Sequence, residues 1–209
     1  MIAVKDFFYR IRYSSYLIFH PFKGFWDLKR GGIGRIGPAT AFILLLALVE
    51  IISSQFTGFI VNYNDILKTN IFFVAIRTAA IVLVWVIANW SVTTLMEGEG
   101  KLKDIYIATA YALVPYIVST IISVILSNFI TAEESSFYYL IQAIGLIWSA
   151  FLLLVGFMTL HQFSFGKTIA TVIITAAAMI VILFLFLMFL TLLQQMINFV
   201  LLIYQEATQ

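Results

Sequence analysis

The stretch AFILLLALVEIISSQFTGFIV, residues 41–61, is long and apolar enough to cross a membrane as one helix. A second stretch of this kind, NIFFVAIRTAAIVLVWVIANW, occupies residues 70–90. Each contains one charged side chain, Glu50 near the middle of the first and Arg77 in the second. A charge at the centre of a membrane helix costs about 2.5–3.5 kcal/mol, so it usually faces protein or a water-filled cavity. These stretches indicate a membrane fold and a place to look for function.

The composition agrees with a membrane protein. Of the 209 residues, 63% are hydrophobic and 11% are charged, and the mean hydropathy is +1.05. Soluble domains contain about a quarter charged residues. The chain has no cysteine, which excludes disulfides and thiolate metal sites. Its apolar residues form five segments of spanning length, at residues 39–61, 70–95, 105–130, 137–161 and 168–193. Because the connections between them are short, we predict an all-α integral membrane bundle of five transmembrane helices.

The basic residues are distributed unevenly along this bundle. Residues 1–38 contain seven of the 12 lysines and arginines, and in a five-span topology only Lys68 falls in a loop on the opposite side. Cytoplasmic segments of membrane proteins carry the excess of Lys and Arg. We therefore expect a cytoplasmic N-terminus and a C-terminus outside.

The last apolar stretch, residues 168–204, is too long for one perpendicular span, and Gln194, Gln195 and Asn198 interrupt its final third. We interpret residues 194–205 as an outward extension or an interfacial helix. A single, strongly tilted helix is the alternative.

Residues 1–38 form a separate amphipathic segment ahead of the membrane domain of residues 39–209. Bulky apolar groups alternate there with basic ones, which suits a helix in the lipid headgroup layer. The segment serves either as a topology anchor alone or as a surface that recognises lipids or partner proteins. The candidate surface residues are Arg10, Arg12, Lys23, Trp26, Lys29 and Arg30.

Three short motifs resemble the bacterial branch of the Yip1-domain family. They are HPFKGFWDLKR at residues 20–30, KDIYIATAYALVPYI at residues 103–117 and GKTI at residues 166–169. The spacing of five spans after an N-terminal region is also similar to that family. The resemblance extends from about His20 to the last span and places the family's tyrosine–proline segment on Tyr111 and Pro115.

The resemblance implies a bacterial plasma-membrane protein and supplies no catalytic residue. Eukaryotic members of the family are Golgi and endoplasmic-reticulum proteins linked to vesicle traffic and Rab GTPases. The first 38 residues here do not have the long acidic, proline-rich composition of those relatives, so we do not expect Rab binding.

Glu50 and Arg77 can be accommodated in three ways. They can form an ion pair between adjacent antiparallel helices, although their side chains lean in opposite directions. Alternatively, Arg77 snorkels to the headgroups, and Glu50 is protonated or bonded to neighbouring polar groups. The third alternative is an ion or proton site.

Two further residues stand out within the spans. Asn89 can hydrogen-bond across helices or line a polar cavity. Pro115 removes a backbone hydrogen bond from the third span, so we predict a kink there. The kink serves packing alone or helps to build a binding site.

The second and third spans are joined by an acidic loop on the same side of the membrane as the end of the fourth span. Carboxylates and a histidine in this region are weak candidates for a metal site, and they are Glu97, Glu99, Asp104 and His161. Two lysines partly neutralise the loop, and we expect Asp104 to cap the third span instead. We predict neither a metal nor another cofactor.

We therefore expect a non-enzymatic, membrane-organising or accessory protein. Its expected partners are membrane lipids, with other integral membrane proteins or a second copy of the chain as candidates, and no nucleic acid. The alternative is a transport-related protein or permease-associated subunit, in which a polar path runs past Glu50, Arg77, Asn89 and Pro115. An intramembrane enzyme is a third reading without support from any nucleophile–base or phosphate-loop motif.

Overall fold

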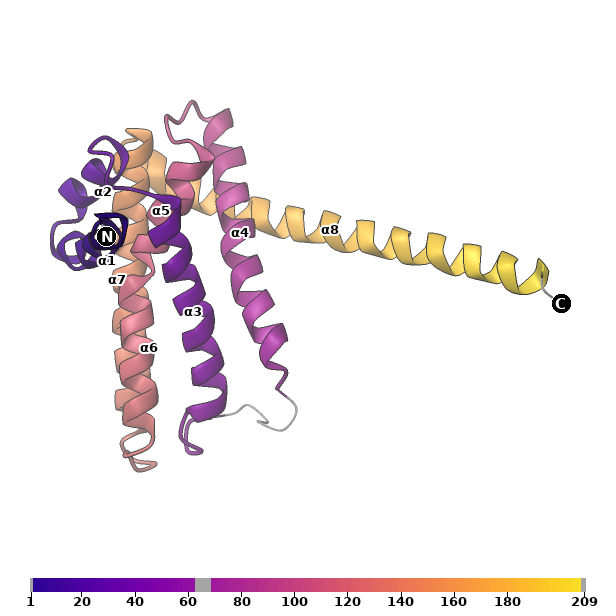
Figure 1. The fold of residues 1–209 in the computed structure, drawn as a ribbon, viewed down its shortest axis with the longest axis horizontal. Helices are drawn as coiled ribbons and strands as arrows, with labels where there is room; N and C mark the ends of the chain where they lie inside the picture. The colour runs from indigo at the N-terminus through magenta and orange to yellow at the C-terminus, as the bar shows by residue number, and fades with distance from the viewer. Residues whose placement is uncertain (1, 63–68, 208–209) are drawn as a thin grey trace.

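The computed structural model describes residues 2–62 and 69–207, and within this part the regular structure is entirely helical (Figure 1). The helices are α1 (Ile2–Phe19), α2 (Pro21–Lys29), α3 (Ile36–Phe56), α4 (Ile71–Leu95), α5 (Leu102–Ala112), α6 (Val114–Ser127), α7 (Ser135–His161) and α8 (Phe165–Ala207). With α5 and α6 taken together, five helices are long and apolar enough to cross a membrane. The predicted all-α membrane fold is confirmed.

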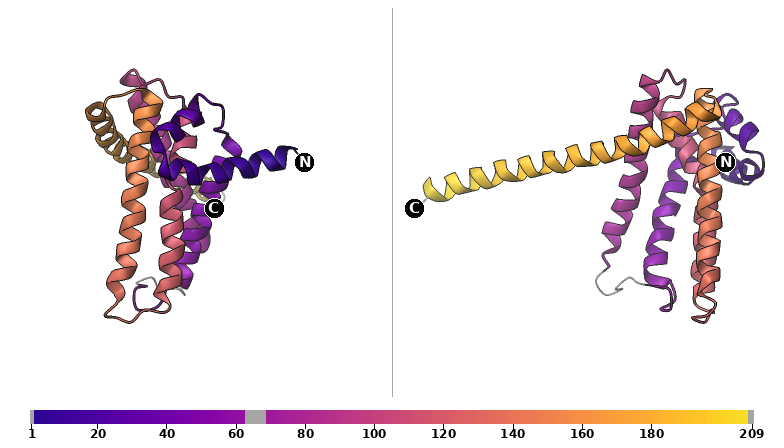
Figure 2. Two further views of the ribbon diagram at one scale, coloured as in Figure 1. Left: turned by 90° about the vertical axis from the view of Figure 1, so that its left-hand side faces the viewer. Right: turned by 180° about the vertical axis from the view of Figure 1, so that it is seen from behind.

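Helices α3, α4, α5–α6 and α7 run alongside one another as a bundle (Figures 1 and 2). At one end α4 and α7 finish and α5 begins, and we call this the helix-pair end, because α1 and α2 lie beside it. At the other, distal end α3 and α6 finish and α4 and α7 begin. Helix α1 runs across the direction of the spans, so Figure 1 shows it end-on and Figure 2 shows it from the side.

The third span is broken where the kink was predicted. Helix α5 ends at Ala112 and α6 begins at Val114, so the two helices meet at Leu113, two residues before Pro115. Proline has no backbone N–H to continue the helical ladder. The N–H of Tyr116 also leaves the ladder and donates to the hydroxyl of Ser149 on α7, at 3.0 Å. The predicted kink is confirmed.

Helix α7 approaches α6 closely at Gly145. A Cβ atom built on Gly145 would lie 1.7 Å from the hydroxyl oxygen of Ser119 and 3.1 Å from the backbone oxygen of Pro115. Small residues allow membrane helices to pack backbone against backbone. Gly145 therefore fixes α7 against the helix that follows the kink.

The buried core lies at the helix-pair end, around α5. Tyr111 and Ile105 of α5 are fully buried there, beside Leu152 of α7. Leu17 of α1 and Phe25 of α2 are also fully buried in this core. The N-terminal helices are therefore part of the bundle's packing, and α3 begins at Ile36, three residues before the predicted span.

Helix α8 differs from the other membrane helices. Thr168, Thr171 and Thr175 are buried, and α8 packs on α4 along this part. Beyond it the helix leaves the bundle, and every side chain from Leu183 to Tyr204 is exposed (Figures 1 and 2). The helix continues through Gln194 without a break. At 43 residues it is about 65 Å long, roughly twice the thickness of the hydrocarbon core.

Candidate functional site

Glu50 is held by a tyrosine from the broken span. The hydroxyl of Tyr116 donates to the Glu50 carboxylate at 2.8 Å. Glu50 is half-buried and lies six residues before the end of α3 at Phe56. The expectation that Glu50 lies at the middle of its span is wrong, because α3 begins and ends several residues earlier than the predicted span.

Arg77 does not form an ion pair with Glu50. Among the residues that the structure describes, no carboxylate lies within the 4.0 Å limit of an ion pair to Arg77. Its side chain is exposed. Of the three ways of accommodating Glu50 and Arg77 that the sequence allowed, the geometry matches the one in which Glu50 bonds to a neighbouring polar group.

The two charged residues nevertheless face the same space. Two cavities of about 310 and 360 Å³ lie between α3 and α4, and Glu50 and Arg77 line both of them. We call this space the distal hollow. Its polar rim at the distal end is formed by Ser53, Ser54, Thr69 and Asn70, and its inner part by Leu113, Tyr116, Thr78 and neighbouring apolar residues.

Asn89 lies elsewhere, in the contact between α4 and α8. It is fully buried, and its side-chain amide donates to the hydroxyl of Thr175 at 3.2 Å. Its side-chain oxygen has no hydrogen-bond partner in the described part of the chain. Asn89 thus forms the expected hydrogen bond across helices and does not line the distal hollow.

Tyr111 and Pro115 are also separate from the distal hollow. The fully buried Tyr111 donates its hydroxyl hydrogen to the backbone oxygen of Arg10 at 3.0 Å, which ties α1 to α5. Pro115 lines a cavity of about 390 Å³ between α6 and α7, and the other walls of this cavity are mainly apolar, including Ile18 and Trp148. The structure brings together only Glu50 and Arg77 of the five intramembrane candidates.

Arg10 is not a surface residue as expected. It is 9% exposed, and its guanidinium donates to Asp6 at 2.9 Å and to the backbone oxygens of Gly32 and Ile33. The Arg10 hydrogen bond and charge hold the pKa of the half-buried Asp6 carboxyl below its usual value. The sequence pattern misses this because a basic residue four positions after an acidic one looks the same on either face of a helix.

The outward face of α1 and α2 carries cations and aromatic rings. Arg12 and Lys23 are exposed and form no ion pair with any described residue. The Arg30 guanidinium lies 4.2 Å from the centre of the Trp26 ring. The strongly exposed aromatic side chains nearby are Phe8, Phe19 and Phe22. We call this face the basic–aromatic face.

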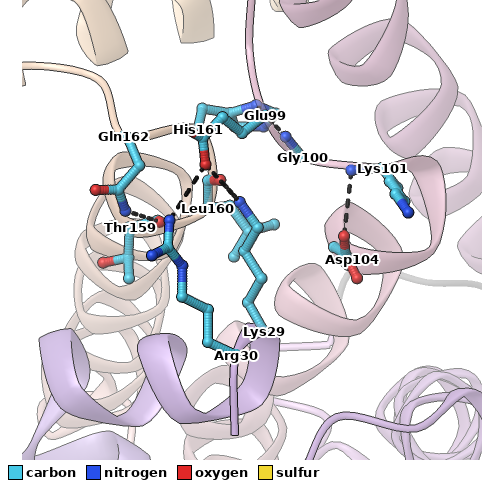
Figure 3. A network of polar contacts seen from close by, with 10 residues as sticks. All are labelled: Lys29, Arg30, Glu99, Gly100, Lys101, Asp104, Thr159, Leu160, His161 and Gln162. Atoms are coloured by element: carbon cyan, nitrogen blue, oxygen red, sulfur yellow. Dashed lines mark hydrogen bonds and ion pairs between the residues drawn. The ribbon is translucent and has the colours of Figure 1, made fainter. Parts of the chain in front are cut away.

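A polar network fastens α2 to the bundle, as Figure 3 shows. The Lys29 ammonium donates to the backbone oxygen of Leu160 at the end of α7. Lys29 and Arg30 also lie 3.3 and 3.4 Å from the Glu99 carboxylate. Lys29 therefore links α2 to the end of α7. Together with Arg30 it also links α2 to the loop that follows α4.

His161, the last residue of α7, also contacts the loop that follows α4. The ring is 2% exposed, and its Nδ1 accepts a hydrogen bond from the backbone N–H of Gly100 at 3.3 Å (Figure 3). A Cβ atom on Gly98 or Gly100 would lie 2.4 or 2.6 Å from the imidazole. These two glycines are required for the loop to pass so close to the ring.

Glu99 and Asp104, two of the four weak metal candidates, have other roles in this geometry. Glu99 faces Lys29 and Arg30, and Asp104 accepts from the backbone N–H of Lys101 at 3.2 Å, so the predicted cap of α5 is confirmed. Within the described ranges, no three His, Asp or Glu side chains gather as metal ligands would.

Sequence reasoning missed the role of Tyr116 as the partner of Glu50. The two residues are 66 positions apart, and three tyrosines lie around Pro115. The available signal is that Tyr116 directly follows the proline, so the kink determines where its side chain points.

The Yip1 domain family model matches residues 15–194 of the chain. No curated protein and no solved structure matches the chain. The matched range includes the end of α1, all of α2 to α7 and most of α8, and with them Tyr111, Pro115 and both charged residues of the distal hollow. This chain belongs to the Yip1 domain family.

Proposed function

We propose that this protein is a non-enzymatic, membrane-organising component that acts through the basic–aromatic face of α1 and α2. The observation that carries the proposal is that these helices are docked on the bundle and still present unpaired cations and exposed aromatic rings. A segment that served only to set topology would not need such a fixed surface.

The docking makes the basic–aromatic face a preformed surface. Leu17 and Phe25 are fully buried, Tyr111 holds the backbone of α1, and Lys29 holds α2 against α7. A preformed surface loses less conformational entropy on binding than a flexible tail does. It can therefore hold lipids or the ends of other membrane proteins in one orientation.

The direction of α1 supports contact with the membrane surface. Helix α1 runs across the spans (Figure 2), as a helix lying in the headgroup layer does. Anionic lipids attract each nearby Lys or Arg by about 1 kcal/mol. In the proposed orientation the helix-pair end is cytoplasmic, in agreement with the seven basic residues of positions 1–38.

The experiment uses the absence of cysteine from the chain. A single cysteine placed by Phe19→Cys carries an environment-sensitive fluorophore on the basic–aromatic face, and the full chain is reconstituted in nanodiscs. We expect a blue shift of the emission when phosphatidylglycerol replaces phosphatidylcholine. Arg12→Gln with Lys23→Gln should abolish that lipid-dependent shift.

The control pair Lys101→Gln with Lys103→Gln removes the same charge at the start of α5, outside the basic–aromatic face. It should leave the shift intact. The proposal would be contradicted if the labelled chain with Arg12 and Lys23 intact gave the same emission in both lipids. It would also be contradicted if both double variants lost the lipid-dependent shift to the same extent.

A transport-related role is the second candidate, and one observation favours it. Glu50 and Arg77 both line the distal hollow, where a polar solute or headgroup could be held. Asn89 and Pro115 lie outside it, so the polar path is confined to α3, α4 and Tyr116. Flux of ions or lipids in proteoliposomes should fall with Glu50→Gln or Arg77→Ala. Equal background rates for all three proteins would remove this candidate.

A further inference from the structure

Glu50 and Arg77 lie at the same depth in the bundle. Glu50 is six residues before the end of α3 at Phe56, and Arg77 is six residues after the start of α4 at Ile71. Since α3 and α4 run in opposite directions, both residues are about 9 Å from the distal end. A ligand entering the distal hollow from that end therefore meets both charges together.

The two charges are opposite but do not neutralise each other. Glu50 accepts one hydrogen bond, from Tyr116, whereas a carboxylate can accept about four. Arg77 has five N–H donors, and none of them bonds to a residue that the structure describes. Ionisable groups within membrane spans usually face the bundle interior or a cavity and mark ligand pathways or sites.

This arrangement fits a ligand that carries both charges. An ammonium would reach the free acceptor positions of Glu50, and a phosphate would reach the donors of Arg77, which favour phosphate oxygens in bidentate geometry. At the rim, Ser53, Ser54 and the side-chain amide of Asn70 supply further polar groups for such a head.

The surroundings of the distal hollow fit an amphiphile more closely than a soluble zwitterion. Phe73 at the rim and Ile81 in the inner part are exposed by 64% and 54%, and the adjacent Phe72 and Ile76 are exposed by 74% and 67%. These side chains lie on the outside of α4, where acyl chains would pack against them. A lipid can therefore place its head between α3 and α4 and leave its chains outside.

We propose that the distal hollow binds the headgroup of an aminophospholipid, with the primary ammonium on Glu50 and the phosphate on Arg77. A quaternary ammonium has no N–H to donate, so phosphatidylcholine should bind more weakly than phosphatidylethanolamine. Phosphatidylglycerol has no cation for Glu50 and should also bind more weakly. This site is independent of the basic–aromatic face.

Native mass spectrometry of the full chain tests the proposal, with equal amounts of the three lipids in the micelles. We expect phosphatidylethanolamine to be retained about tenfold more than the others, the ratio that one strong additional interaction produces. Glu50→Gln should abolish this preference. Arg77→Gln should reduce retention of both zwitterionic lipids, and Arg77→Lys should restore part of it.

Two controls separate this site from global damage and from the basic–aromatic face. Glu133→Gln makes the same change as Glu50→Gln at an exposed position in the loop before α7 and should behave like the parent chain. Arg12→Gln with Lys23→Gln should also keep the preference, even if it abolishes the response to phosphatidylglycerol described above. A thermal unfolding midpoint close to that of the parent confirms that each variant is folded.

The source of the ligand is tested by adding soluble O-phosphoethanolamine. If O-phosphoethanolamine displaces phosphatidylethanolamine at millimolar concentration, the site recognises the ammonium and phosphate that both compounds carry, and the ligand is assigned as a free solute. Retention of the lipid supports the lipid assignment. The proposal is overturned if the parent chain shows no preference among the lipids, if it prefers phosphatidylglycerol, or if Glu50→Gln keeps the preference.

Discussion

Tyr111, fully buried near the end of α5, donates its hydroxyl hydrogen to the backbone oxygen of Arg10, 101 residues earlier in the chain. This bond joins the N-terminal helices to the broken membrane helix. It connects the tyrosine of the family's tyrosine–proline segment with the position of the basic–aromatic face. The strength of this connection can be measured.

Tyr111→Phe should loosen α1 without disrupting the bundle. The ring still fills the core, but the Arg10 backbone oxygen keeps only its bond within α1 and loses the one from Tyr111, and a hydrogen bond of this kind contributes about 0.5–1.5 kcal/mol. We expect a lower thermal unfolding midpoint in detergent and faster hydrogen exchange in α1.

Tyr106→Phe is the matched control, since the Tyr106 hydroxyl lies 3.0 Å from the hydroxyl of Thr40 on α3 and forms no hydrogen bond to the described part of α1. Exchange in α1 should stay at the parent rate in that variant. If both variants accelerate it equally, the Tyr111–Arg10 bond does not hold the helix.

Gly100→Ala should strain the loop after α4. The new Cβ atom would lie 2.6 Å from the His161 ring, and such overpacking typically costs about 1–3 kcal/mol. Because Glu99 is the adjacent residue, the displaced loop should also weaken the ion pairs with Lys29 and Arg30. Differential scanning fluorimetry gives the loss of stability.

A double variant identifies the cause of this loss. His161→Ala removes the ring that the new methyl group meets, so adding Gly100→Ala to it should cost much less than in the parent chain. Additive losses in the double variant would mean that the clash with His161 is not the source of the effect.

The membrane helices and the kink could be predicted from the sequence because both depend on local rules. Apolar runs of spanning length predict spans directly. Pro115 lacks an N–H, and this local property predicts an interruption of the helical ladder near Leu113. The cap by Asp104 involves residues three positions apart and follows from the same kind of local rule.

The contacts that build the candidate sites could not be predicted in this way. Glu50 could bond to Arg77 or to any polar group at a similar depth, and only the packing of α3 against α6 selects Tyr116. His161 and Gly100 are 61 residues apart, and nothing local marks either as a partner of the other. The hydrophobic pattern of α1 also does not reveal that Arg10 faces inward.

Acid should loosen the start of α1. The hydrogen bond and charge of Arg10 lower the pKa of Asp6 below 3.8, so the stabilisation is present above pH 3.8. It is lost as the pH falls through the lower pKa of the folded state. We expect hydrogen exchange in α1, corrected for its intrinsic pH dependence, to accelerate when the pH is lowered from about 5 to about 3.

Asp6→Asn should remove most of this pH response, because the amide does not titrate. Asp27→Asn changes a carboxylate on α2 that accepts from Tyr13 at 3.2 Å and is not bonded to Arg10, so the response should persist in that variant. A response of equal size in both variants would assign the acid sensitivity to another group.

The position of α8 should depend on the buried hydroxyl of Thr175. Thr175→Val keeps the shape of the side chain but removes the acceptor of the Asn89 amide, which the structure places at 3.2 Å. Interhelical hydrogen bonds in membranes contribute about 0.6 kcal/mol on average, so we expect a small loss of stability and a clear gain in motion of α8. Because the native chain has no cysteine, spin labels at Ile174→Cys and Leu83→Cys can report the distance distribution between α8 and α4. The distribution should broaden in Thr175→Val.

Thr191→Val is the control, because Thr191 is also in α8 and also donates to the backbone oxygen four residues earlier, but its side chain is exposed. An unchanged distribution in Thr175→Val, or equal broadening in Thr191→Val, would show that the Asn89–Thr175 bond does not hold α8 on the bundle.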